Sequence, residues 1–151
     1  MDQNGNPSSR RCNTLLTRPI EVAAALIFRS GKLLITQRHA DSHLGGLWEF
    51  PGGKREPGET FEQCLCRELR EELGCNVEVL ELVESITHNY PEKSVLLRFH
   101  RCRWLAHEPQ PLDCAAVRWV SRLELEQFKF PAADAQLLGR LTNEDSFWAG
   151  A

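Results

Sequence analysis

Long apolar runs are missing from this sequence, and so is the pattern of a secretory signal peptide at its N-terminus. A membrane-spanning helix needs about 20 predominantly apolar residues, so none is expected. Positive charge is not in excess either, since the formal net charge is −3 at pH 7. The electrostatic footprint of a protein that binds duplex nucleic acid is therefore absent. We expect a soluble cytoplasmic protein whose partners include neither a membrane nor a nucleic-acid polymer.

Cysteine pairs of the C-x-x-C type are also missing, although the chain has six cysteines: Cys12, Cys64, Cys66, Cys75, Cys102 and Cys114. Cys64 and Cys66 are two residues apart in a segment with a helical pattern, so their side chains point to nearly opposite sides. They cannot chelate one ion together. The spacing therefore argues against a zinc site or a disulfide framework and predicts free thiols in a reducing compartment.

No internal repeat is visible, and 151 residues suit one domain with a sizeable core. Residues 1–18 are polar and lack an apolar period, which predicts a mobile N-terminal tail. The folded domain is then expected over residues 19–142. Residues 143–151 are expected to form a C-terminal tail, and the last ten residues to be frayed.

Apolar patterns between these tails predict strands and helices in mixed order. The expected strands cover residues 20–28, 32–38, 76–85, 93–105 and 117–121, with a hairpin between the first two. Short helices are expected over residues 123–128 and from Pro131 onward, because proline suits a first helical position. Residues 38–46 are turn-rich and indicate a loop, and Pro51, Gly52 and Gly53 then break the backbone, either as an ordinary loop or as part of a site. This order predicts an α+β fold with a mixed β-sheet and a helix against one face.

One helix is predicted with unusual clarity over residues 60–73. Thr60 followed by Gln63 is a capping-box signature, and Gly74 is a natural residue just past a helix end. Leucines at positions 65, 69 and 73 form an apolar stripe. This helix therefore packs one side against the core.

The neighbouring side of this helix is acidic. Glu68, Glu71 and Glu72 fall within one arc, where each like-charged pair costs about 0.2–0.5 kcal/mol. Two of them lie in the last turn, where the helix dipole disfavours anions. A charged helix face is ordinarily a solvated surface, but here only Arg67 and Arg70 offset the repulsion locally. The crowding favours a hard divalent cation bound by oxygen ligands.

The residues from Gly53 to Cys75 resemble the Nudix box, G-x5-E-x7-R-E-U-x-E-E-x-G-U, in which U is a bulky aliphatic residue. Gly53, Glu59 and the run RELREELG match every polar and glycine position. Cys75 is the one departure, at the final aliphatic place, where it affects packing rather than metal chemistry. The resemblance implies a Nudix fold, which is an α/β/α sandwich.

The resemblance also implies roles for individual residues. A divalent cation, Mg²⁺ or Mn²⁺, would be held by the Gly52 carbonyl and by the carboxylates of Glu68, Glu71 and Glu72. Glu68 is also a candidate general base that Arg67 would orient, and Glu59 would be a structural or outer acid. Lys54 could meet the phosphates. Asp113, from a later loop, could join the metal directly or through water.

Beyond the box, the stretch ITQRHADSHLGGLWEFPGGK and the later FPAAD resemble the MutT branch and its relatives, the CTP pyrophosphohydrolases. In that branch the residues matching Arg38, His43, Glu49 and Phe50 contact the nucleotide. The alternatives are a surface histidine at position 43 and a core phenylalanine at position 50. Asp134 falls where this branch reads the base, but it could equally be a helix-start residue favoured by the dipole.

These residues predict a Mg²⁺-dependent nucleoside triphosphate pyrophosphohydrolase that releases a monophosphate and pyrophosphate. Oxidised nucleotides such as 8-oxo-dGTP are the first expected substrate, which would make this a pool-sanitising enzyme that protects DNA. A hydrolase of CTP or a modified pyrimidine triphosphate is the alternative. A third hypothesis is a Nudix-like binding module without catalysis, although such modules commonly lack the box carboxylates. The partner is a small nucleotide, and the protein is expected to be a monomer or homodimer.

Overall fold

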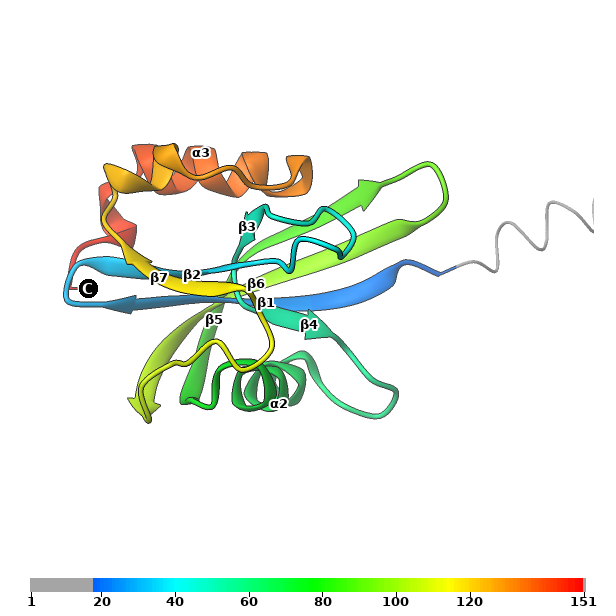
Figure 1. Cartoon of the computed structure of the whole chain (residues 1–151), viewed down its shortest axis with the longest axis horizontal. Coiled ribbons are helices and arrows are strands. Elements are labelled where there is room, and N and C mark those ends of the chain that lie inside the picture. The colour runs from blue at the N-terminus through cyan, green and yellow to red at the C-terminus, as the bar shows by residue number, and fades with distance from the viewer. Residues whose placement is uncertain (1–17, 151) are drawn as a thin grey trace, which may run out of the picture.

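The computed structural model describes residues 18–150, so the predicted N-terminal tail lies almost wholly outside the described residues. A mixed, seven-stranded β-sheet lies between helices α2 and α3, which cover opposite faces (Figure 1). The chain thus forms the α/β/α arrangement of an α+β fold. The expected fold class is confirmed.

Strand β1 (Ile20–Arg29) connects the parts of the sheet. It pairs antiparallel with β2 (Lys32–Gln37), which confirms the predicted hairpin, and parallel with β6 (Ser94–Ala106). It also pairs antiparallel with β4 (Gly52–Lys54). Because β1 has neighbours along both edges, its backbone is buried, and a continuous apolar sequence is what such a strand requires.

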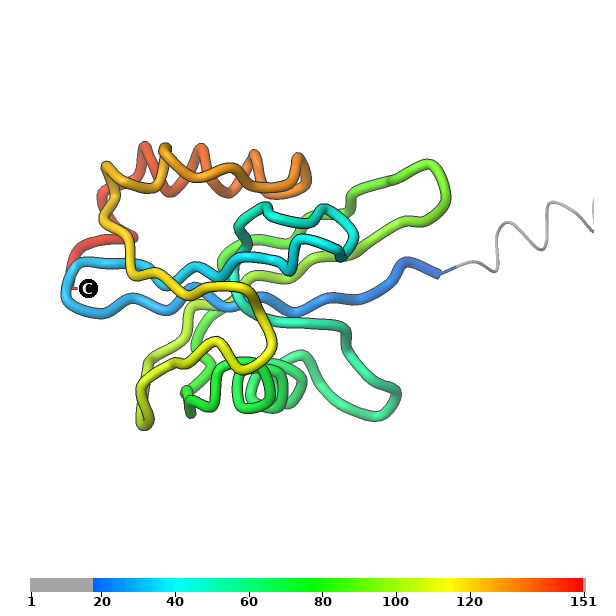
Figure 2. The backbone as a smooth tube through the Cα atoms, in the orientation of Figure 1, coloured from blue at the N-terminus to red at the C-terminus, as the bar shows by residue number. Residues whose placement is uncertain are grey.

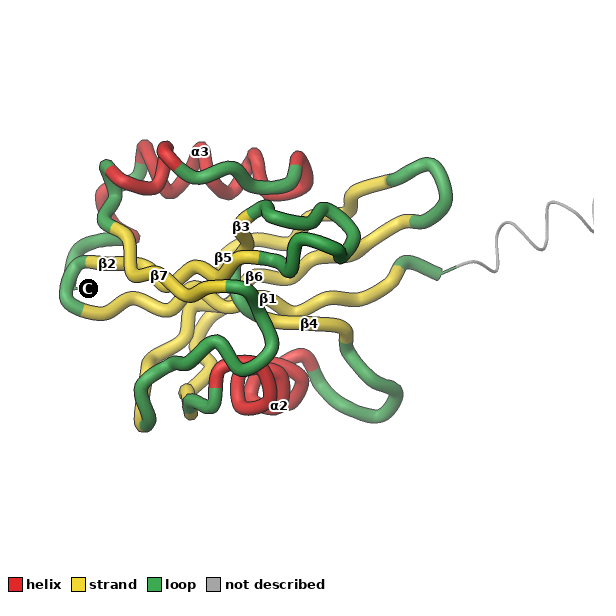
Figure 3. The backbone as a smooth tube through the Cα atoms, in the orientation of Figure 1, coloured by secondary structure: helices red, strands yellow, loops and turns green. Residues whose placement is uncertain are grey.

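The remaining strands are β3 (Trp48–Glu49), β5 (Asn76–Asn89) and β7 (Ala116–Val120). Strand β5 runs four residues past the expected end at Ser85 and forms a long hairpin with β6 (Figure 3). The short strands β3 and β4 replace the loop expected around Pro51. Glycine can join a ladder where a side chain would collide, and local turn signals do not show that ladder.

Helix α2 (Phe61–Leu73) confirms the expected capping. The Thr60 side chain accepts a hydrogen bond from the Gln63 amide, and the Gln63 side chain accepts one from the Thr60 amide. Gly74 ends the helix in the left-handed conformation with φ of 69°. The apolar stripe of Leu65, Leu69 and Leu73 is fully buried. Local sequence signals could predict this helix because each of them acts within a few residues.

The core has two layers, one on each face of the sheet. Alternating side chains of β1 serve both, with Ala23 and Ile27 facing α2 and Ala24 and Leu26 facing the α3 side. A two-residue period of this kind is the geometry of a strand. Both layers of the core are therefore built on one strand.

The C-terminal segment contains the 3₁₀ turns Glu124–Gln127, Ala132–Asp134 and Asp145–Phe147 and helix α3 (Ala135–Asn143). The expectation that the last ten residues are frayed is wrong for the part of them that the structure describes. Phe147 is buried, the Trp148 indole donates to the Leu141 carbonyl at 2.8 Å, and its ring packs edge-on against Phe28. The segment returns to the β1–β2 turn (Figure 2), a contact that sequence proximity does not reveal.

Cys64, Cys66, Cys75, Cys102 and Cys114 are free thiols, as expected, and Cys12 lies outside the described residues. All but Cys66 are buried. Between residues 18 and 150 no helix is both long enough and apolar enough to cross a membrane.

Candidate active site

Arg67 lies at the centre of the acidic face of α2. It donates two hydrogen bonds to Glu59, from Nε to Oε2 at 2.9 Å and from Nη2 to Oε1 at 2.7 Å. Its Nη1 lies 3.1 Å from Glu68 Oε2 and 3.3 Å from Glu71 Oε1. The guanidinium lowers the pKa of Glu59 to about 2. One fixed cation therefore orients Glu68, as the resemblance implies.

Glu72 is half-buried beside this network and lacks the same support. Its Oε1 atom has no hydrogen-bond partner among the described residues. Burial raises the pKa of Glu72 to about 8, the charges of Glu49, Glu68 and Asp113 add to the effect, and the Gly52 backbone opposes it. An unpaired, desolvated carboxylate is costly unless a cation or a proton neutralises it.

Gly52 and Gly53 on β4 make room for the acids. A Cβ atom at Gly53 would lie 2.2 Å from the carboxyl carbon of Glu68, and one at Gly52 would lie 1.9 Å from the Ala23 carbonyl oxygen. The contact at Gly52 is with backbone and leaves no room for a side chain, whereas a side chain at Gly53 would displace the Glu68 carboxylate. The glycines therefore let β4 pass between β1 and the acidic helix, which fits the predicted close approach of backbone to the site.

A cavity of about 260 Å³ is lined by Glu72, Gly53, Asp134 and Phe50 among other residues. All five nucleotide-contacting residues predicted from the resemblance line it: Arg38, His43, Glu49, Phe50 and Asp134. Lys54 and Gly52 line it too. The structure thus brings the predicted phosphate side and base side of the site into one space.

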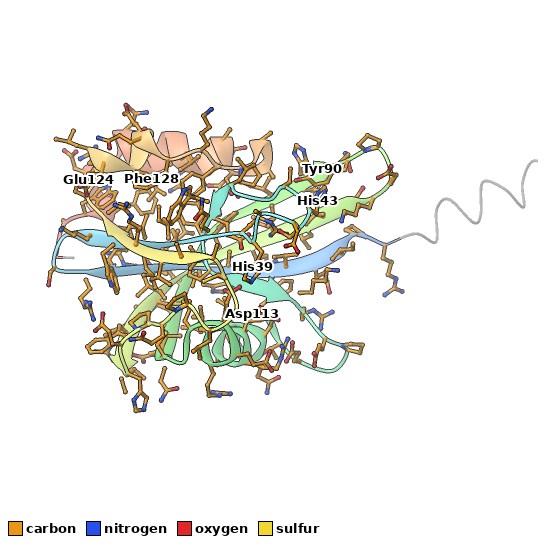
Figure 4. The ribbon with its side chains drawn as sticks, viewed as in Figure 1. His39, His43, Tyr90, Asp113, Glu124 and Phe128 are labelled. Atoms are coloured by element: carbon orange, nitrogen blue, oxygen red, sulfur yellow. The ribbon has the colours of Figure 1, made fainter. Side chains whose placement is uncertain are left out.

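Arg38 organises the loop that forms one wall. Its Nε donates to the His43 carbonyl at 2.6 Å, and its Nη1 donates to Glu49 Oε1 at 2.9 Å. Burial raises the pKa of Glu49, and Arg38 opposes that rise. His43 points toward the tip of the β5–β6 hairpin, where its ring meets Tyr90 edge-on at 6.0 Å (Figure 4). His43 is therefore part of the cavity mouth.

Asp134 and Phe50, which are predicted to contact the nucleotide, both line the cavity. Phe50 is buried and contacts the rings of Phe99 and Phe130, so it belongs to the core and lines the cavity at once. Asp134 is also buried and makes no side-chain capping bond to α3. Burial raises the pKa of Asp134 to about 7, with Glu49 adding to the rise. A group with this pKa can present either a hydroxyl donor or two acceptors near neutral pH.

Glu71, Lys54 and Asp113 are exposed. The Lys54 carbonyl accepts from Arg67 at 3.1 Å, and the Asp113 amide donates to the Glu72 carbonyl at 3.1 Å. Over residues 18–150, no three Asp, Glu, His or Cys side chains gather closely enough to hold an ion as they stand. Of the predicted metal-binding carboxylates only Glu72 lines the cavity, and Glu68 is engaged by Arg67.

Sequence reasoning missed Tyr90 and Lys93, which line the cavity from the β5–β6 turn. The turn itself was expected around Tyr90, but β5, one of the two strands that carry it to the cavity, is longer than its pattern indicates. Only a pairing between distant segments places these residues, so no local signal could have identified them.

The donor set at the acid end suits a hard divalent cation. Oxygen ligands are the ones that Mg²⁺ and Mn²⁺ prefer. The unpartnered Glu72 Oε1 and its raised pKa are the features that a bound cation would relieve. The residues therefore fit a divalent metal, and the cavity beyond them has room for an elongated ligand.

A NUDIX domain model matches residues 23–140 of this chain. The CTP pyrophosphohydrolase of Escherichia coli is 44% identical over 125 residues, which cover 79% of this chain and 88% of that protein. The 8-oxo-dGTP diphosphatase of Haemophilus influenzae is 38% identical, with 83% of this chain and 93% of the relative covered. A solved MutT structure from methicillin-resistant Staphylococcus aureus is 32% identical with a TM-score of 0.70, covering 85% of this chain and 99% of its own.

Proposed function

This chain belongs to the NUDIX domain family and is a Nudix hydrolase, and from that premise we propose a Mg²⁺-dependent nucleoside triphosphate pyrophosphohydrolase. The products are a nucleoside monophosphate and pyrophosphate. One observation carries the proposal: a single cavity is lined both by Glu72, whose Oε1 has no hydrogen-bond partner among the described residues, and by the buried acid Asp134. A nucleotide needs contacts to its polyphosphate and to its base, and a cavity lined by a candidate metal-binding acid and a candidate base-reading acid can supply both.

The metal would be held by Glu68, Glu71, Glu72 and the Gly52 carbonyl, with Asp113 as a further ligand. When bound, such an ion neutralises phosphate charge and makes a bound water more acidic. Mn²⁺ has the same ligand preferences and is expected to substitute.

Residues of the chain itself then hold the reacting groups in place and accept a proton. Water attacks an inner phosphorus, its proton passes to a carboxylate of which Glu68 is the candidate, and the bridging oxygen leaves with pyrophosphate. Burial raises the pKa of Glu68, which makes it a better base, and Arg67 at 3.1 Å holds it in place. Lys54 lies at the cavity wall, where its ammonium meets the phosphates.

A cytosine nucleotide is the candidate substrate that a protonated Asp134 suits. A protonated Asp134 donates to the ring nitrogen of cytosine and accepts from its amino group, and burial with a pKa of about 7 makes that form available. The relative at 44% identity is named for CTP.

Oxidised guanine nucleotides are the second candidate. An ionised Asp134 offers two acceptors to the two donors of a guanine edge, and several relatives are named for 8-oxo-dGTP. Hydrolysis of that substrate would remove damaged precursors before DNA synthesis. Either substrate belongs to the cytoplasmic nucleotide pool, and we place the enzyme there, as a monomer or homodimer.

A turnover panel tests the proposal. CTP, its 5-substituted forms, 8-oxo-dGTP and the canonical triphosphates are incubated with Mg²⁺, and products are resolved as pyrophosphate or phosphate. We expect pyrophosphate release that requires the metal. Binding of nucleotides with no turnover of any of them would instead favour the non-catalytic module, and release of phosphate with a nucleoside diphosphate would refute cleavage between the α- and β-phosphates.

A further inference from the structure

His39 contacts Asp113 across two loops that are far apart in the sequence. The imidazole Nε2 lies 3.5 Å from Asp113 Oδ1, and Figure 4 shows His39 directly above Asp113, between the cavity loop and the end of α2. Neither the box motif nor the cavity lining includes His39. The contact between His39 and Asp113 therefore has a role that neither the box motif nor the cavity explains.

The backbone on both sides of this contact is fixed. The His39 carbonyl accepts from the Ser42 amide at 3.1 Å and from the Ser42 hydroxyl at 2.7 Å. The amide of Asp113 donates to the Glu72 carbonyl, and the amide of Ala115 donates to the Gln37 carbonyl at 2.8 Å. Asp113 is thus tied to the last turn of α2 and to the end of β2, and only its side chain is free to choose a direction.

We propose that His39 is a positioning residue that holds the Asp113 carboxylate at the Glu72 end of α2 and so couples the cavity loop to the metal-binding acids. The proposal rests on the metal site of the proposed function. Ligating carboxylates are commonly held by an outer hydrogen bond, and loss of such a partner weakens metal binding by about 10–100-fold. Because His39 and Asp113 are half or more exposed, at 51% and 81%, we expect about tenfold.

Mn²⁺ binding to the full chain without nucleotide tests the role, with free Mn²⁺ followed by electron paramagnetic resonance. His39→Ala should weaken binding about tenfold, while His39→Gln, whose amide can still donate, should retain most of it. In an Asp113→Asn background the His39→Ala change should cost nothing further, because the partner is already lost. His107→Asn, which removes another exposed imidazole, is the control and should bind Mn²⁺ like the wild type. Melting temperatures without metal should be equal for all variants.

Two results would overturn the proposal: wild-type Mn²⁺ affinity in His39→Ala, or an equal loss with and without Asp113→Asn. If the wild type hydrolyses triphosphates with Mg²⁺ while His39→Ala keeps full Mn²⁺ affinity, only the role of His39 fails. If the wild type neither binds Mn²⁺ nor hydrolyses any triphosphate, the proposed function fails with it.

Discussion

Arg67 holds Glu59 through two nearly parallel hydrogen bonds of 2.9 and 2.7 Å and, with its remaining nitrogen, reaches Glu68 at 3.1 Å. The first contact fixes the plane of the guanidinium, and the second transmits that orientation to the candidate base. Glu59 is not a neighbour of the cavity, so its effect on catalysis passes through Arg67.

Arg67→Lys should therefore lower kcat by about 10–100-fold, because one ammonium cannot grip Glu59 with two bonds and orient Glu68 as well. KM should change less. Steady-state kinetics with the preferred triphosphate provide the measurement. Arg70→Lys, at an exposed position of the same helix, is the matched control, and kcat for Arg67→Lys equal to the control would contradict the role.

Glu72→Gln should reduce the stabilisation that Mg²⁺ gives the fold. Saturating metal, at about a hundredfold over its Kd, should raise the melting temperature of the wild type by roughly 5–10 °C. The rise should be much smaller in the variant, whose metal-free stability should equal or exceed that of the wild type because a half-buried acid is gone. Glu81→Gln, at an exposed position of β5, should respond to Mg²⁺ like the wild type. Equal shifts in all three proteins would place the metal elsewhere.

Asp134 should make the stability depend on pH. Its pKa is about 7 in the folded protein and ordinarily 3.8, so the folded state binds the proton more tightly than the unfolded state. This contribution is complete below about pH 4 and is lost as pH rises to about 7. Asp134→Asn should therefore gain stability relative to the wild type on going from pH 4.5 to pH 8, by on the order of 2 kcal/mol.

Urea unfolding of both proteins at the two pH values measures that gain. The exposed Asp41→Asn serves as the control for removal of one carboxyl group. A constant difference between Asp134→Asn and the wild type at both pH values would show that Asp134 is ionised throughout.

The same Asp134→Asn variant should separate the two candidate substrates. An amide always has one donor group and one acceptor, which suits cytosine, but it cannot offer guanine two acceptors. Loss of a polar contact costs about 1–3 kcal/mol, so kcat/KM for 8-oxo-dGTP should fall by roughly tenfold or more relative to CTP. Asp134→Ala should lower kcat/KM for whichever nucleotide is preferred. A uniform loss across all nucleotides together with a lower melting temperature would mean that Asp134 serves only the fold.

Local signals in the sequence predicted α2 and the acids on it, because the cap at Thr60, the glycine at position 74 and the leucine stripe all act within one helix. They also predicted the β1–β2 hairpin. They could not predict β4, since its glycines look like a loop until their pairing with β1 is known. The engagement of Glu49 by Arg38 depends equally on tertiary contacts.

Large separations along the sequence limited the prediction of the candidate site in the same way. Asp113 could be proposed from the family resemblance, but its contact with His39 could not, because two separate loops must meet. Phe147 and Trp148 were mistaken for a frayed end because their packing partners, such as Phe28, come from the other end of the chain.

Burial of the thiols affects how readily oxidants react with the cysteines of this protein. Burial raises the pKa of Cys64, Cys75 and Cys114 to about 11 and that of Cys102 to about 12. Peroxide attacks the thiolate, and at pH 7 only roughly one in ten thousand or fewer of these groups is ionised. These four buried cysteines should thus resist sulfenic acid formation under the conditions that oxidise guanine. The enzyme should therefore remain active under conditions that damage nucleotides.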